Sequence, residues 1–507
     1  MGSDLSKSIT PPPISFQDCL INGNVDIARY LYYCRKKDDF WLNKKRKYKE
    51  VFKVKKHCTK KSVKRHKILV RNEDGTLREI RPKDTLWYLL YINTPPRNKR
   101  LAKQFRLRFR MPYESCVTLS EDIYEHEIFN QWTHVDATGE EPSNIKLLLL
   151  GSLRYIGRAW TIDDIEEANG ISSETNRQFL NCFIEYGSTF LYRKWVLDPA
   201  INQDICEQER LFRQAGFNGC IGSSDATHVG MLSCAIWAKI MHKGFKLNIP
   251  SRTYNMTVTH SRKILGSTLG HPATWNDKTL QLYDELLCGV RDSVLHDTFE
   301  FMLYDIDEEG NVIEVPYKGV WFMVDNGYLS WSCTVPPIKD GTTYPEIRFS
   351  EWLESMRKDV ECAFGILKGR FTILRYGTRF QSITRCDQLW LTCCAIHNMI
   401  LDIDGLDENW DNGTPSNWEL INDRHIETPF AISKLNRNFT TDELMQIQEN
   451  VNSDMEEIIE DTSKKYDKYT VDGKRVVAKM PLHLFQQCLV RHFDIRFKRK
   501  DIIWRNI

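Results

Sequence analysis

The spacing of apolar residues divides the chain into a helical part and a part that mixes strands and helices. From Phe105 onward, apolar positions recur every three or four residues, as in helices that pack on a core. Between residues 200 and 400, short β-rich runs alternate with helical stretches, which predicts a mixed α/β domain. The predicted units are a largely flexible, basic arm (1–100), a helical domain (101–195), an α/β domain (196–400), and an acidic loop followed by a charged helical extension (401–507).

A three-helix pattern occupies residues 143–190. Ser143 and Asn144 can cap the first helix, the second follows Thr161, and Asn169-Gly170 supplies the left-handed turn that ends it. The third helix is capped at Ser172-Ser173. We expect its buried face at Phe179, Phe183 and Phe190, and its outward N-terminal positions at Glu174, Thr175, Arg177 and Gln178.

A small residue, a tight turn and a capped second helix form the helix-turn-helix arrangement, in which the second helix enters the major groove of DNA. Such turns also occur in helical domains that never touch DNA. We favour DNA contact, with base edges read by Thr175, Arg177 and Gln178.

Two predicted strands lead to carboxylates. The unbroken apolar run Val320 to Val324 predicts a strand buried on both faces, with Asp325 at its carboxyl end, and a similar run ends at Asp225. Strand-like runs at 253–260 and 263–270 follow, and then a helix from Asp277. Three strands, a helix and a buried strand predict a ribonuclease H-like fold with a mixed five-stranded sheet and flanking helices.

That fold requires a third carboxylate on a later helix. In residues 349–371, one apolar stripe is formed by Leu353, Met356, Val360, Phe364, Leu367 and Phe371. Glu361 lies about 100° from Val360 on the helix, at the flank of that stripe, and Gly365 removes side-chain bulk one turn later. We therefore expect Glu361 to meet Asp225 and Asp325 at the edge of the sheet.

Three oxygen donors without His or Cys suit Mg²⁺ or Mn²⁺ as the cofactor, and two such ions can promote phosphodiester cleavage. Taken singly, each acid has a simpler explanation. Asp225 would belong to a strand-end turn, Asp325 to an Asn-Gly turn, and Glu361 to a solvated helix face. Their combined placement favours the catalytic and metal-binding interpretation.

For several residues near the three acids, two interpretations remain open. His228 either contacts the scissile phosphate or a metal-bound water, or is a hydrogen-bonded structural residue. Asp277 is expected to be an N-cap rather than a fourth metal ligand, and His397-Asn398 a packing signature without chemistry. The cations that follow Glu361 either line the DNA path or form a solvated face: Lys368, Arg370, Arg375 and Arg379.

Charge is unevenly distributed along the 507 residues, although the net charge is only +2. Residues 41–67 carry 13 Lys or Arg against one acid, Glu50. A basic block on an acidic body indicates nuclear import, nucleic-acid contact or a solvated disordered face, and we predict a nuclear location. No apolar run is long enough to span a membrane. The N-terminus lacks a secretory pattern, so we expect reduced cysteines.

From Phe109 to Ile400 the chain resembles the PIF/Harbinger-type transposases and their domesticated nuclease relatives. The resemblance rests on Phe109-Arg110-Met111-Pro112, Asp225-Ala226-Thr227-His228, Asn276-Asp277, Val324-Asp325-Asn326-Gly327-Tyr328, the block from Val360 to Phe371, and Cys393-Cys394-Ala395-Ile396-His397-Asn398. It implies a DDE triad of Asp225, Asp325 and Glu361, a ribonuclease H-like fold, and metal-dependent strand cleavage and joining. One departure is Ala226, where the family motif usually has glycine.

The leading hypothesis is an active transposase-type endonuclease that acts on double-stranded DNA. The alternatives are a domesticated DNA- or protein-binding factor that does not cut, and a structure-selective nuclease without a joining step. The resemblance also implies a separately encoded Myb-like DNA-binding partner, and homo-oligomerisation is possible.

Overall fold

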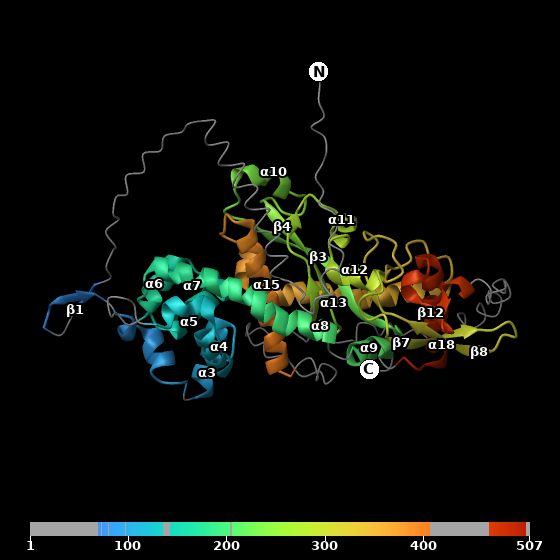
Figure 1. The fold of residues 1–507 in the computed structure, drawn as a ribbon, viewed down its shortest axis with the longest axis horizontal. Helices are drawn as coiled ribbons and strands as arrows, with labels where there is room; N and C mark the ends of the chain where they lie inside the picture. The colour runs from blue at the N-terminus through green and yellow to red at the C-terminus, as the bar shows by residue number, and fades with distance from the viewer. Residues whose placement is uncertain are drawn as a thin grey trace, which may run out of the picture.

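The structure is a computed structural model, and it describes residues 69–502 except 72–73, 80, 97, 135–141, 203–204 and 406–465. The basic run 41–67, with its predicted import signal, and most of the predicted acidic loop lie outside the described residues. The described part is elongated, with N-terminal helices at one end, a sheet in the middle, and a hairpin with C-terminal elements at the other end (Figure 1).

A mixed sheet forms the centre of the molecule, so the chain is an α/β protein. Its first three strands are antiparallel neighbours, and the two later strands run parallel to the first. In spatial order the strands are β10 (Thr334–Val335), β9 (Trp321–Met323), β3 (Cys220–Gly230), β4 (Ser251–Val258) and β5 (Ile264–Ser267), and β6 (His271–Pro272) pairs with β4.

The sequence predicted these strands in the right order, but two boundaries were wrong. All three residues of β9 are fully buried, as expected of an apolar run. β3 does not end at Asp225 but continues to Gly230, because residues 223–230 pair with β4 along their whole length. The helix predicted from Asp277 is broken into α11 (Asp277–Gln281) and α12 (Glu285–Arg291), and Asp284 caps the second.

The helix α13 (Tyr344–Arg370) packs against β3, β4 and β9. It begins at a capping box between Thr343 and Glu346, and its predicted apolar stripe is confirmed, because all six residues of the stripe are buried. The short α14 (Thr372–Tyr376) follows, and α15 (Ile383–Ile403) is buried along most of its length. These helices join the sheet to the N-terminal helices.

The N-terminal unit is helical, as predicted, but it starts before residue 100. Trp87 and Tyr91 are buried, and their rings contact Phe109. The elements here are β1 (Leu69–Arg71), β2 (Leu77–Glu79), η1 (Pro82–Asp84), η2 (Tyr88–Ile92), α3 (Lys99–Phe109), α4 (Tyr113–Glu125), η3 (Glu127–Trp132), α5 (Ile145–Arg158), α6 (Ile162–Asn169) and α7 (Ser173–Tyr186).

The predicted caps of these helices are confirmed at Asn144, Thr161 and Ser172, and Gly170 ends α6 in the left-handed conformation. Phe190 was wrongly expected on the buried face. It is exposed because the helix changes at residue 187 to the π-helical η4 (Gly187–Leu191), which rotates the later positions. The chain then continues through η5 (Arg193–Leu197), α8 (Asp198–Asn202) and α9 (Cys206–Gln214).

The C-terminal segment is part of the fold rather than a separate charged extension. The hairpin of β7 (Glu300–Ile306) and β8 (Val312–Lys318) pairs with β12 (Lys474–Val476), whose partner is β11 (Thr470–Val471). The helix α18 (Leu482–Arg499) packs against β7 and α13, with Phe485 and Phe493 fully buried. The remaining short turns are η6 (Ile236–Ala238), α10 (Lys239–His242), η10 (Asp467–Tyr469) and η11 (Val477–Lys479).

In the described part of the chain, no helix is long and apolar enough to cross a membrane. All described cysteines are free, and most are buried, where they pack as small apolar side chains.

Candidate active site

Two neighbouring parallel strands bring Asp225 and Asp325 to the same level of the sheet. Ser223 of β3 is the register partner of Met323 of β9. Asp225 lies two residues further along β3, and Asp325 lies two residues beyond the end of β9, so the parallel register brings both residues to the same edge of this strand pair. The pKa of Asp225 is raised to about 6, mainly by burial and further by the charges of Asp325 and Asp277.

Asp277 is a third carboxylate in this group, and the expectation that it caps a helix was wrong. The N-cap of α11 is Asn276, whose side chain accepts a hydrogen bond from the Thr279 N–H at 2.9 Å. The pKa of Asp277 is raised by burial and then by Asp325. A Cβ built on Gly327 would lie 2.9 Å from Asp277 Oδ2 and 2.9 Å from Asp325 Oδ1. The two carboxylates therefore lie on either side of a space that only a glycine leaves open.

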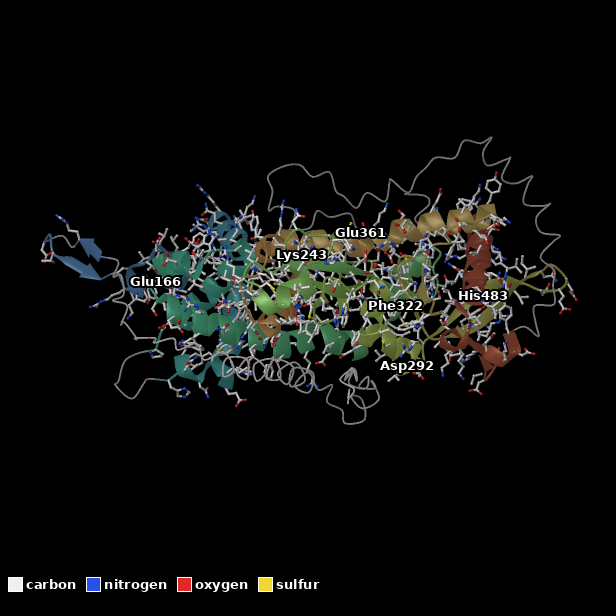
Figure 2. The ribbon with its side chains drawn as sticks, turned by 90° about the horizontal axis from the view of Figure 1, so that it is seen from above. Glu166, Lys243, Asp292, Phe322, Glu361 and His483 are labelled. Atoms are coloured by element: carbon white, nitrogen blue, oxygen red, sulfur yellow. The ribbon has the colours of Figure 1, made fainter. Side chains whose placement is uncertain are left out.

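Glu361 lies midway along α13 (Figure 2), and Arg357, one turn earlier, connects it to Asp225. The Arg357 guanidinium donates to Asp225 Oδ2 at 3.3 Å and to Glu361 Oε1 at 3.2 Å. It also pairs with Glu354 at 2.8 Å. The Arg357 side chain is buried, whereas that of Glu361 is 50% exposed. Arg357 thus links Glu361 on the helix to Asp225 on the sheet.

Sequence reasoning missed Arg357. The signal was present, because a cation four residues before an acid on a helix places the two charges on one face. The chain contains many such pairs, however, and only the packing of α13 against β3 distinguishes this one. Gly365 leaves open space one turn after Glu361, as expected, since no atom of the described residues lies within 4 Å of a Cβ built there.

His228 and Lys368 form a second polar group on the other side of Asp225. Lys368 Nζ donates to Thr227 Oγ1 at 2.7 Å and to the His228 carbonyl at 3.0 Å, which ties α13 to β3. His228 Nδ1 is 3.0 Å from Thr253 Oγ1. Burial, followed by Lys246 and Lys368, lowers the pKa of His228 to about 4, so the imidazole is neutral at pH 7.

Arg370 was wrongly expected to line a DNA path. It is 3% exposed and donates to His397, and burial lowers its pKa to about 9. Arg375 and Arg379 are exposed. His397 and Asn398 are packing residues, as predicted: Asn398 accepts from the Ile264 N–H at 2.9 Å and donates to the Ile264 carbonyl at 2.8 Å.

The helix α7 lies among the N-terminal helices at one end of the elongated molecule, whereas β3 and α13 lie in its middle (Figure 1). Arg177 and Gln178 are exposed, and both bond to Glu174, while Thr175 is half-buried and bonds to the Ser172 hydroxyl at 2.8 Å. Arg177 and Gln178 are therefore accessible at the N-terminal end of α7, and Thr175 is partly accessible.

Within the described residues, no three Asp, Glu, His or Cys side chains are arranged so that they could hold a metal ion as they stand. The chemistry of the donor set nevertheless fits a divalent cation. The donors are all carboxylates, and burial together with mutual repulsion raises the pKa of two of them. Arg357 supplies the compensating positive charge in this structure.

The comparison with protein families finds a match in the central part of the chain. Residues 196–408 are similar to the family described as plant transposon protein. No curated protein and no solved structure matches the chain significantly. The matched range contains the whole central sheet, α13 and all the carboxylates described above. This part of the chain is therefore related to transposon proteins.

Proposed function

We propose that the protein is a transposase-type DNA endonuclease in which Asp225, Asp325 and Glu361 form the catalytic triad. The observation that carries the proposal is the pairing of β3 with β9, which sets two carboxylates side by side, with Glu361 linked to one of them through Arg357. Similarity to transposon proteins over residues 196–408 supports the reaction class. The motifs quoted above support the finer assignment to the PIF/Harbinger type.

The topology supports a ribonuclease H-like fold for this domain. Three antiparallel strands are followed by helices and by a strand parallel to the first, and a long helix then packs across the sheet. Carboxylates on the first strand, after the fourth strand and on that helix are the positions that such a nuclease would use. Asp277 would be an additional acidic residue beside Asp325.

Mg²⁺ or Mn²⁺ would be held by Asp225, Asp325 and Glu361. When bound, such ions polarise the scissile phosphodiester and stabilise charge on the leaving oxygen. The protein's own residues prepare this chemistry. Burial and like charges raise the pKa of Asp225. Lys368 holds α13 against β3, and the neutral imidazole of His228 is available as a hydrogen-bond partner.

Recognition of double-stranded DNA would fall to the helix pair α6 and α7. Thr175, Arg177 and Gln178 would read bases at the N-terminal end of α7, as in a helix-turn-helix. The basic run 41–67 would add phosphate contacts and direct the protein to the nucleus. A Myb-like partner protein and homo-oligomerisation belong to the same proposal.

Arg357 favours one alternative, a domesticated factor that binds DNA or protein without cutting. A guanidinium within 3.3 Å of both Asp225 and Glu361 supplies positive charge to these acids without any metal ion. A catalytic protein would have to exchange this pairing for a divalent ion. A non-cutting protein would keep it.

Nicking of supercoiled plasmid DNA distinguishes the two functions. We expect the full chain to convert the plasmid to open circles with Mg²⁺ or Mn²⁺ and not with EDTA. Asp325→Asn should abolish nicking while the melting temperature stays close to that of the wild type, because an amide oxygen can still accept from the Gly327 N–H. The matched control is Asp340→Asn, at an exposed aspartate. Nicking that survives in Asp325→Asn would refute the triad, and a wild-type protein that never nicks would support the non-cutting alternative.

A further inference from the structure

The connection between β3 and β4 exposes an unusual amount of apolar surface. We call residues 232–249 the β3–β4 flap. Ile240 is 87% exposed, and Phe245 is fully exposed. The exposed large apolar side chains of the flap are Leu232, Ile236, Ile240, Met241, Phe245 and Ile249. Single exposed apolar residues are ordinary, but a contiguous set indicates a binding surface.

Buried side chains and hydrogen bonds hold the inner side of the flap against the protein, and this fixes the orientation of its outer side. Cys234, Ala238 and His242, spaced four residues apart, are buried. His242 Nδ1 is 3.1 Å from the Ser251 carbonyl, and the Thr274 hydroxyl donates to the Met241 carbonyl at 3.1 Å. Small and polar side chains therefore face the protein, while the large apolar ones face outward. This is the reverse of a helix that covers a core.

The flap adjoins the proposed active site. It follows directly from β3, the strand that carries Asp225, and it contacts the loop that leads into α11 and Asp277. After burial, the charge of Lys246 is the largest influence that lowers the pKa of His228, and it also opposes the rise in the pKa of Asp277. Figure 1 shows α10 and α11 on the same side of the molecule, beyond the β3–β4 pair.

Charge identifies the class of partner. Residues 231–250 contain three lysines and no acid, and Lys239, Lys243 and Lys246 are all exposed. The neighbouring carboxylates repel phosphate, so a DNA strand that approaches them needs positive charge close by. Proteins that distort DNA combine such cations with apolar side chains that lie against unstacked bases.

We propose that the β3–β4 flap holds locally unpaired DNA beside the cleavage site, with Ile240 and Phe245 against exposed bases and the three lysines on phosphates. The inference rests on the proposed function and deepens it, because it names opened DNA, rather than intact duplex, as the form held at the site. Apolar contact with bases requires that they leave the stack, while the lysines hold the backbone of either form.

The test compares two fluorescent DNAs of the same length, a fully paired duplex and a duplex with a short central bubble, both in EDTA so that nothing is cut. We expect Ile240→Ala/Phe245→Ala to weaken binding of the bubble by about tenfold and binding of the paired duplex much less. The matched control is Ile313→Ala, an exposed apolar residue on β8, which should change neither. Replacing the three lysines with Gln should weaken both DNAs and flatten the salt dependence by about one unit per lysine.

Equal affinities of the apolar variant and the wild type for the bubble would overturn the proposal. So would an apolar variant whose DNA binding is intact but whose sedimentation changes, since the flap would then be a protein interface. The melting temperature of each variant excludes unfolding as the cause. If the wild-type protein binds the bubble through the flap but never nicks plasmid, the nuclease proposal is refuted and the flap proposal is kept. If the protein nicks plasmid but the flap variants bind the bubble like the wild type, the flap proposal is refuted and the nuclease proposal is kept.

Discussion

At the scale of single residues, Asp225 carries an energetic cost in the folded protein. Its side chain is mostly buried in the middle of β3, and Asp325 and Asp277 add like charge. The Ala226 N–H donates to its carboxylate at 2.7 Å and Arg357 pairs with it at 3.3 Å, yet the pKa of Asp225 still rises to about 6. A buried carboxylate whose pKa is raised in this way is typical of functional sites.

Asp225→Asn should therefore stabilise the metal-free protein at pH 7. The folded-state pKa, about 6, lies above the reference value of 3.8, so the folded state binds the proton more tightly than the unfolded state does. The free energy of unfolding of the wild type therefore falls as the pH rises from about 4 to 6, whereas that of the variant does not, because its amide does not ionise. We expect a gain of about 1–3 kcal/mol in the free energy of unfolding at pH 7.

Denaturant unfolding in EDTA at pH 7 and at pH 4 measures this difference, which should shrink at the lower pH. Asp340→Asn, at an exposed site, serves as the control. A variant that is less stable than the wild type at pH 7 would show that the ion pair with Arg357 outweighs burial and repulsion.

Site residues could be predicted from the sequence where a local apolar pattern fixes their position. They could not be predicted where tertiary packing determines which way the side chain faces. Asp325 follows an apolar run, and Glu361 flanks an apolar stripe, so both could be located. Arg357 and Arg370 are both cations on the same helix. Only the tertiary structure shows that one faces the carboxylates and the other is buried against His397.

At the scale of elements, α13 carries an open glycine face. Glu361, Gly365 and Gly369 are spaced four residues apart, and no atom lies within 4 Å of a Cβ built on either glycine. Glycine inside a helix costs about 0.5–1 kcal/mol relative to alanine. Because packing within the described residues does not require these glycines, we infer that they leave the helix surface clear for a ligand beside Glu361.

Two substitutions at Gly365 should separate stability from DNA binding. Gly365→Ala should raise the free energy of unfolding by about 0.5–1 kcal/mol, since alanine meets no neighbour there. Gly365→Gln should fold equally well but weaken DNA binding, because its longer side chain occupies the cleared surface. Urea unfolding and fluorescence anisotropy with duplex DNA give the two values. Wild-type affinity in the Gln variant would show that DNA does not lie on this face.

Element prediction failed mainly where strands pair across long sequence separations. β7 alternates buried and exposed residues, which is a recognisable strand pattern, yet its hairpin was not predicted. The sheet that contains it is completed by β12, about 150 residues later along the chain, and that segment reads as a charged extension when considered alone. α18 was expected to be helical but not buried, because its apolar face becomes evident only against α13.

At the scale of the whole molecule, the predicted boundary at residues 195 and 196 does not separate two cores. Phe179 and Phe183 of α7 belong to the same buried cluster as Tyr254 of β4 and Trp390 of α15. The N-terminal helices and the sheet are therefore packed as one body. A second cluster joins α13, the hairpin and α18.

Removal of residues 406–507 should destabilise the part of the protein that carries the candidate site. Without α18 and β12, buried residues such as Tyr317, Trp321 and Phe349 lose the cover of Phe485 and Phe493. We expect the shortened chain to be largely insoluble and to bind a hydrophobic dye, and co-expression of residues 466–507 to restore solubility. A soluble shortened chain that unfolds cooperatively at the wild-type temperature would contradict this expectation.

The docking of α18 on α13 has a consequence for the order of events during synthesis. Glu361 leaves the ribosome more than a hundred residues before Phe485 and Phe493, which complete the core beneath its helix. The carboxylates are therefore present in the nascent chain well before their support is. We conclude that the nascent chain cannot hold a finished site until Phe485 and Phe493 have also left the ribosome.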